Sequence, residues 1–288
     1  MAVLFGLISA FLVFSSIFIP IQVTLFFSGL PIFCAYLAYG NSCGSIAFIL
    51  VTTILFLIFP AETSFDIFLS MIAPAALLGH LSIKNIEHKN KIWWYPESFL
   101  LLHFVLLSFA SVAFMSAVYY SEDALLKASN EAIKPLLTSN NLNVSSVQNY
   151  ITSTIKYSVG VGMLIKMLAT LLNFNLAHII TKKIKRNIRP EFNLSSIKIN
   201  NFIAIFPLIS LTIAQIFPSV SFLCSGLFVV GLFAPMLCGF SVVYRLLDIR
   251  ARFIFSFTLL ILTLPTLAVV IILGIIDSFY AIEKKASK

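Results

Sequence analysis

The chain has 288 residues, of which 60% are hydrophobic and only 10% are charged, against roughly 45–50% and 25% in a typical soluble domain. This composition excludes an ordinary water-soluble domain and predicts a protein that sits in the lipid bilayer. The net charge of +8 arises largely from Lys and Arg at the ends of apolar stretches. Such residues anchor helices at the membrane surface, so we expect no binding to nucleic acid.

Long apolar stretches follow one another along the chain, most of them near the roughly 17–25 residues that a helix needs to cross a bilayer. Hydrocarbon offers the backbone no hydrogen-bonding partner, so each span is expected to be an α-helix. Pro20, Pro60 and Pro218 separate several of them, because proline ends helices. We predict an all-α, polytopic transmembrane helical bundle of about eight to nine spans, forming a single integral membrane domain over residues 1–288. The predicted spans are residues 2–19, 21–39, 42–59, 65–83, 98–120, 157–180, 202–217, 219–243 and 253–277.

The orientation of the spans follows from the basic residues, which stay on the cytoplasmic side of short loops. Residues 181–200, after the sixth span, are rich in Lys and Arg and are expected to form a basic cytoplasmic loop. Nine spans then place the N-terminus inside and the C-terminus outside. The tail residues Lys284, Lys285 and Lys288 favour the inside, so either the rule fails at the tail or one span is miscounted.

Residues 121–156 form an extended polar region between the fifth and sixth spans. Apolar residues recur there at helical spacing, beginning just after Ser121, which is a suitable N-cap. We therefore predict a short polar helical insert, extramembrane and amphipathic, that lies on the membrane face opposite the basic loop. It is too short to form a domain of its own.

An ionisable side chain inside the sixth span indicates a candidate binding site. Lys166 lies about 13 Å into the span at the rise of an α-helix, where burying a charge costs about 2.5–3.5 kcal/mol. Gly162, Lys166, Thr170 and Asn173 share one helix face because they are three or four residues apart. This polar stripe either lines a cavity or belongs to a structural lysine that is paired with a carboxylate or with backbone carbonyls.

His103 lies in the fifth span, about 9 Å from the cytoplasmic edge. Thr170 and Asn173 come to a similar depth if the sixth span runs in the opposite direction. We therefore take Lys166, Thr170, Asn173 and His103 as candidate substrate-binding residues. The alternative for His103 is an ordinary core histidine with a satisfied hydrogen bond.

Catalytic and metal-binding motifs are absent from the sequence, which lacks paired Cys/His spacings, glycine-rich phosphate loops and nucleophile elbows. We therefore expect no enzyme, no cofactor and no metal. Asp248 stands three residues after Arg245, and we expect an ion pair between them.

Small residues recur at four-residue spacing in the first span, at Ala2, Gly6 and Ala10. Such a face lets another helix approach closely. We expect it to form a helix-packing contact, either within the chain or with a partner subunit.

Short motifs stand along most of the chain, namely Gly6, Leu30-Pro31, Trp94-Tyr95-Pro96, Asn175-Leu176-Ala177, Arg189-Pro190, Gly239, and Gly274 with Asp277. In this order they resemble the YybS-like family of bacterial multi-pass membrane proteins, a domain of unknown function. This resemblance implies the bacterial cytoplasmic (inner) membrane and a distant likeness to the substrate-binding subunits of energy-coupling-factor transporters. Those subunits use four-spaced small residues on their first helix to dock a membrane partner, so other membrane subunits or an energising ATPase module are the partners it implies. The extra helices and the insert depart from that pattern.

Two functions fit the sequence. The first is a transport-type membrane subunit that binds a small solute between its helices. The second is a non-catalytic membrane scaffold or assembly factor that binds other proteins through the insert and the basic loop. For a solute, Glu62 and Asp66 favour a cation whereas Lys166 favours an anion, so its charge stays open.

Overall fold

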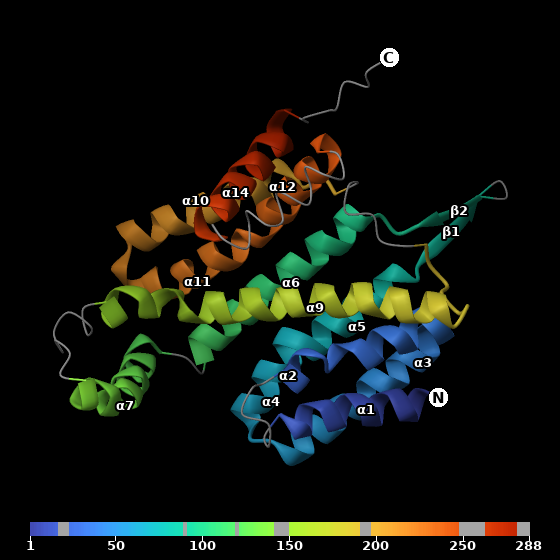
Figure 1. The fold of residues 1–288 in the computed structure, drawn as a ribbon, viewed down its shortest axis with the longest axis horizontal. Coiled ribbons are helices and arrows are strands. Elements are labelled where there is room, and N and C mark those ends of the chain that lie inside the picture. The colour runs from blue at the N-terminus through green and yellow to red at the C-terminus, as the bar shows by residue number, and fades with distance from the viewer. Residues whose placement is uncertain are drawn as a thin grey trace.

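Long helices packed side by side dominate the computed structural model (Figure 1). Within the described part of the chain, five helices are long and apolar enough to cross a membrane, and three shorter apolar helices accompany them. The chain is therefore all-α in class and suited to a membrane. The structure describes residues 1–16, 23–88, 91–118, 121–140, 150–190, 197–247 and 263–280.

The helices follow the predicted spans closely. The fourth predicted span begins four residues early, directly after Pro60, and the sixth continues three residues further, to Lys183. Residues 17–19, 21–22, 119–120 and 253–262, from four predicted spans, lie outside the described part. The elements are α1 (Ala2–Ser15), α2 (Val23–Phe26), α3 (Gly29–Ile58), α4 (Ala61–Ile67), the π-helix η1 (Phe68–Ile72), α5 (Ala73–Ser82), β1 (Asn85–His88), β2 (Lys91–Trp94), α6 (Glu97–Val118), α7 (Glu122–Asn140), η2 (Ile155–Tyr157), α9 (Ser158–Lys183), α10 (Asn201–Ile216), η4 (Pro218–Val220), α11 (Ser221–Gly231), α12 (Phe233–Leu246) and α14 (Thr263–Tyr280).

Helix α3 is two helical arms joined at Gly40, where φ is +83°. Glycine has no Cβ and adopts this conformation without strain. The Tyr36 and Ser45 hydroxyl groups, nine residues apart in sequence, lie 3.3 Å from each other. The same separation along a straight helix is about 13 Å. The chain therefore reverses at Gly40, between the predicted spans 21–39 and 42–59.

A two-stranded antiparallel hairpin connects α5 to α6 and departs from the all-helical expectation. Strand β1 pairs with β2, and Ile86 lies opposite Trp93. Both side chains are exposed. The hairpin projects beyond the helix ends (Figure 1), where water can hydrate its strand edges, so the rule that excludes open sheets from hydrocarbon does not apply to it.

The polar insert begins as expected. The Ser121 hydroxyl accepts a hydrogen bond from the backbone N–H of Ala124 at 3.2 Å, and α7 starts at the next residue, Glu122. Residues 141–149 of the insert lie outside the described residues. The chain is helical again from Tyr150.

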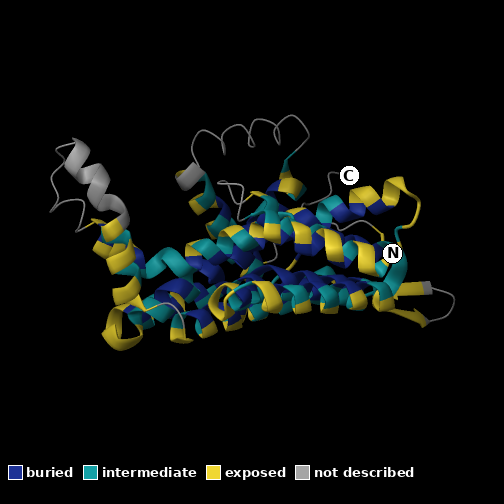
Figure 2. Cartoon of the chain, turned by 90° about the horizontal axis from the view of Figure 1, so that it is seen from below, coloured by how far each residue is buried: buried dark blue, intermediate teal, exposed yellow. Residues whose placement is uncertain are grey.

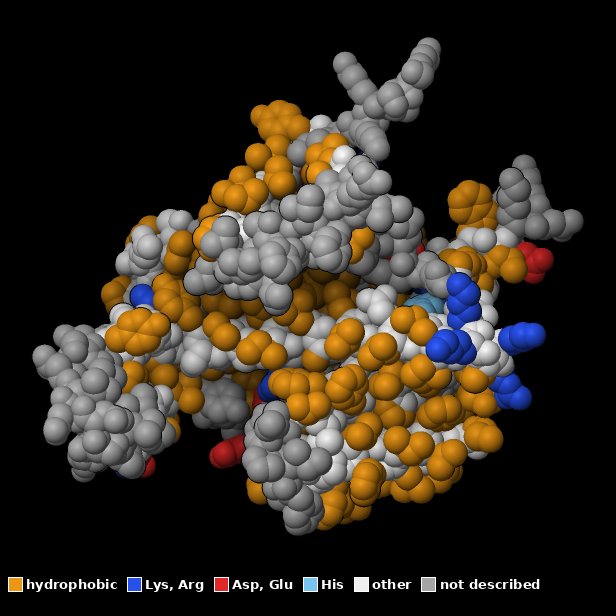
Figure 3. Space-filling view, in the orientation of Figure 1, with side chains coloured by type: hydrophobic (Ala, Val, Ile, Leu, Met, Phe, Trp, Pro, Cys, Tyr) orange, Lys and Arg blue, Asp and Glu red, His pale blue; other side chains and the backbone are white. Residues whose placement is uncertain are grey.

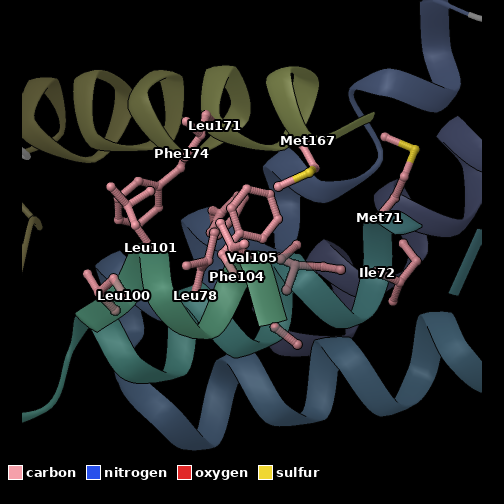
Figure 4. Packing of buried hydrophobic residues seen from close by; sticks show 14 of the residues in the cluster. Met71, Ile72, Leu78, Leu100, Leu101, Phe104, Val105, Met167, Leu171 and Phe174 are labelled. Carbon is pink, nitrogen blue, oxygen red and sulfur yellow. The ribbon is translucent and has the colours of Figure 1, made fainter. Parts of the chain in front are cut away.

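The core lies where α5, α6 and α9 meet (Figure 4). The core residues Leu78, Phe104, Met167 and Phe174 are each no more than 2% exposed. Apolar side chains also cover much of the outer surface, and Leu57 is 79% exposed. Figures 2 and 3 show buried residues along the inner faces of the helices and a largely hydrophobic exterior. Such an exterior is what a surface in contact with lipid requires.

Lys and Arg side chains gather at the end of the molecule where α9 finishes (Figure 3). Most of the described residues of the basic loop are exposed there, but Arg189 is only 4% exposed. Its guanidinium donates to the Ser82 carbonyl at 3.0 Å and lies 3.8 Å from the Glu97 carboxylate. Burial lowers the pKa of Arg189, and the Glu97 carboxylate opposes this shift. Arg189 therefore ties the loop to α5 and α6.

Helices α12 and α14 pack at very close range. A Cβ added at Gly239 would overlap the Val270 carbonyl, and one at Gly274 would overlap the Pro235 carbonyl. Glycine is required at both positions because only it allows the two backbones to approach this closely.

Arg245 pairs with Asp277 of α14 at 2.6 Å. The Asp277 carboxylate also accepts from the Cys238 thiol at 3.4 Å. Asp248, the partner expected for Arg245 from sequence spacing, lies outside the described residues, so that expectation stays a prediction. Arg245 and Asp277 stand near the C-terminal ends of α12 and α14, which places these two ends together.

Candidate functional site

Lys166 of α9 forms an ion pair with Asp66 of α4. Its Nζ lies 2.7 Å from Oδ1 and 2.6 Å from Oδ2 of the carboxylate. The two side chains are 19% and 26% exposed, so the pair is neither solvated nor sealed inside the core. Of the two structural alternatives open from sequence, a carboxylate partner is the one present.

A π-helix follows Asp66 and sets the local geometry. In η1 the hydrogen bonds span five residues, which widens the turn. The Ser70 hydroxyl donates to the Asp66 carbonyl at 2.5 Å. From α6, the Ser111 hydroxyl donates to the Leu69 carbonyl at 3.1 Å, which holds the widened turn against its neighbour. Single π turns occur frequently at functional sites.

A cavity of about 260 Å³ lies beside the ion pair. Asp66 and Lys166 are its charged lining residues among those described. Four segments enclose it, namely α4 with η1, α6, the start of α7 and the first turns of α9. The remaining walls are mainly apolar, formed by Leu69, Val112, Met115, Leu125, Val159 and Met163.

Two residues at the start of α9 keep this cavity open and partly polar. A Cβ added at Gly162 would meet no atom within 4 Å. By contrast, one at Gly160 would lie 2.5 Å from the Gly226 carbonyl oxygen, so Gly160 serves close packing on α11. Ser158 also lines the cavity. Its hydroxyl oxygen is buried and has no hydrogen-bond partner among the residues that the structure describes.

The predicted polar stripe divides into two parts. Gly162 and Lys166 face the cavity, whereas Thr170 and Asn173 are buried further along α9 and do not line it. The Thr170 hydroxyl donates to the Lys166 carbonyl at 2.9 Å, and the Asn173 amide donates to the Phe26 carbonyl at 2.5 Å. Thr170 therefore bonds within α9, whereas Asn173 connects α9 to α2.

His103 lies apart from the cavity. Its Nδ1 is 2.7 Å from the Phe99 carbonyl, and its ring lies 6.1 Å from that of Tyr95. These contacts belong to the first turns of α6, next to the hairpin. The structure therefore does not bring His103 together with Lys166.

The small-residue face of α1 lies against α3 in the same chain. A Cβ added at Gly6 would lie 2.6 Å from the Leu50 side chain and 3.0 Å from the Ala47 carbonyl. Ala10 is also buried, whereas Ala2 is half-buried. The close approach that the spacing predicts is therefore made inside the chain at Gly6. Docking of a partner on this face stays a prediction.

Within the part of the chain that is described, no three His, Cys, Asp or Glu side chains lie together so as to hold a metal ion. Comparison of the chain with protein-family models, with curated proteins and with solved structures gives no match. The interpretation of the site therefore depends on its own geometry.

Sequence reasoning identified Lys166 but missed Asp66, Ser111 and Ser158 as members of the same site. Asp66 carried a usable signal, because a carboxylate at the edge of an apolar span needs a cation to offset its desolvation. The two serines carried none, because serine is common in membrane helices and usually bonds to its own backbone.

Proposed function

We propose that this chain is a transport-type membrane subunit that binds a small solute in the cavity beside Asp66 and Lys166. The observation that carries the proposal is a partly exposed ion pair, set among apolar helices, at the wall of an open cavity. Ion pairs inside membrane segments are costly and commonly mark solute or ion pathways. The cavity volume of about 260 Å³ is near the lower end of the range of small-molecule sites, roughly 300–1,000 Å³.

A purely structural ion pair needs no empty space beside it. Close packing of a bundle favours side chains that fill the volume between helices. At Gly162 the chain instead carries its smallest residue and leaves the space open. The unpartnered Ser158 hydroxyl supports the same reading, because a buried polar group without a partner is costly unless a bound molecule or water satisfies it.

We further propose that the protein is YybS-like, lies in the bacterial cytoplasmic membrane and has its basic end in the cytoplasm. The Phe5 and Tyr39 rings lie 5.8 Å apart. This distance supports placing the start of α1 at the end of the molecule where the chain reverses at Gly40. The Arg245–Asp277 pair supports a common end for α12 and α14. If both termini lie in the cytoplasm, the chain must cross the membrane an even number of times. The lysine-rich tail agrees with a cytoplasmic C-terminus, and an even number of crossings disfavours nine spans.

Native mass spectrometry of protein extracted gently from its own membrane tests the proposed function. The wild type should retain a small molecule that Gly162→Leu loses, because leucine would occupy the cavity. Val161→Leu is the matched control, since Val161 is exposed on the outer face of the same turn. Retention of the same molecule by Gly162→Leu would place the solute elsewhere and refute the proposal.

The alternative function is a membrane scaffold or assembly factor. It is supported by the exposed basic side chains Lys182, Lys183, Lys185 and Arg186 at the end of α9 (Figure 3). This reading expects the same extraction to recover other membrane proteins and no solute. It also expects reversal of the four charges to release those proteins while Gly162→Leu leaves them bound. A co-purifying ATPase together with a solute would instead identify an energy source for transport.

A further inference from the structure

The charges at the cavity cancel each other. Lys166 contacts both carboxylate oxygens of Asp66, and the described lining contains no other ionisable side chain. Considered separately, the two residues favour solutes of opposite charge. As a bidentate pair they form a neutral site.

A solute with a single charge would disturb this balance. A carboxylate that bound Lys166 would displace Asp66, and an ammonium that bound Asp66 would displace Lys166. In either case one side chain would remain charged and unpaired among Val112, Met115 and Met163. Removing one partner of a buried pair is strongly unfavourable because the remaining charge is uncompensated.

The pair can still hydrogen-bond to a molecule without net charge. A lysine ammonium has three donors, of which the carboxylate takes two, and a carboxylate has about four acceptor positions. One donor of Lys166 and lone pairs of Asp66 therefore stay available. Ser158 lines the same cavity, and its buried hydroxyl has no hydrogen-bond partner among the described residues.

We propose, resting on the proposed solute site, that the cavity selects compact molecules with no net charge, either neutral or zwitterionic. Their polar end carries both a donor and an acceptor and contacts Asp66 and Lys166. Their apolar body lies against Val112, Met115 and Met163. This assignment resolves the opposite preferences that Asp66 and Lys166 show when they are considered alone.

Four probes that share an isobutyl group test this selectivity at pH 7. They are isovaleramide (neutral), leucine (zwitterionic), isovalerate (anionic) and isoamylamine (cationic). Binding to the full chain in detergent is measured by isothermal titration and by thermal stabilisation. Isovaleramide or leucine should bind at least about tenfold more tightly than either ion, a difference of about 1.4 kcal/mol.

Charge-neutralising variants provide an independent measurement. Lys166→Met should shift the preference towards isoamylamine, and Asp66→Asn should shift it towards isovalerate. If either variant fails to fold, the other still reports the shift, and the wild-type ranking stands without them. Gly162→Leu should abolish binding of every probe, whereas Val161→Leu should leave it unchanged.

The outcomes separate this inference from the proposed function. Gly162-dependent binding that is tightest for an ion, or equal for all four probes, overturns the selectivity and leaves the solute site standing. Absence of Gly162-dependent binding for every probe overturns the solute site and the selectivity together.

Discussion

The Lys166–Asp66 ion pair permits a quantitative test by a double-mutant cycle. Removing one partner of a fully buried pair costs about 3–5 kcal/mol. Here the side chains are 19% and 26% exposed, and partial solvation screens the remaining charge. We therefore expect Lys166→Met and Asp66→Asn each to lower the free energy of unfolding by about 2 kcal/mol. The double variant leaves no unpaired charge and should cost about 1.5 kcal/mol, which gives a coupling energy of about 2.5 kcal/mol.

The cycle is measured by reversible denaturation of the four proteins in mixed detergent micelles. Lys183→Met is the control, because Lys183 is an exposed lysine at the end of the same helix, and it should change stability by less than about 0.5 kcal/mol. Additive effects of Lys166→Met and Asp66→Asn would show that the two side chains do not interact and would refute the proposed geometry.

Three further variants test the packing of the bundle. Gly274→Val should lower the free energy of unfolding by about 3 kcal/mol, because the new Cβ would overlap the Pro235 carbonyl and overpacking costs about 1–3 kcal/mol or more. A thermal unfolding midpoint equal to that of the wild type would refute this contact. Arg189→Met should cost about 2 kcal/mol through the lost charged hydrogen bond to Ser82, and denaturant titration would contradict this if Arg189→Met matched the wild type. Gly6→Leu should separate α1 from α3 and make α1 accessible to added protease, whereas unchanged protection would place the small-residue face elsewhere.

Several features of the fold could be predicted from the sequence because they depend on local pattern. Apolar length determines which segments cross a membrane. The break at Gly40 coincides with a boundary between two predicted spans, because a short polar interruption there separates two apolar runs. The start of α7 after Ser121 follows from a side chain that caps the helix next to it.

Features that depend on distant partners could not be predicted in this way. Asp66 and Lys166 are 100 residues apart, and which helices pack together decides whether they meet. Arg245 pairs with Asp277, 32 residues away, although Asp248 is its nearer acidic neighbour in sequence. Thr170 lies on the same face of α9 as Lys166, but it is buried and does not line the cavity. Helical spacing does not tell where a cavity ends.

The ion pair itself gives a reason to prefer a solute-binding function over a structural one. Replacing a buried ion pair by apolar groups of similar volume is often neutral or stabilising, so stability alone does not require charges at Asp66 and Lys166. If the double variant loses no more than the expected stability of about 1.5 kcal/mol but no longer retains a solute, the charges serve binding. If it loses stability and keeps the solute, they serve the fold, and Gly162 with Ser158 would be left as the parts of the cavity that recognise a ligand.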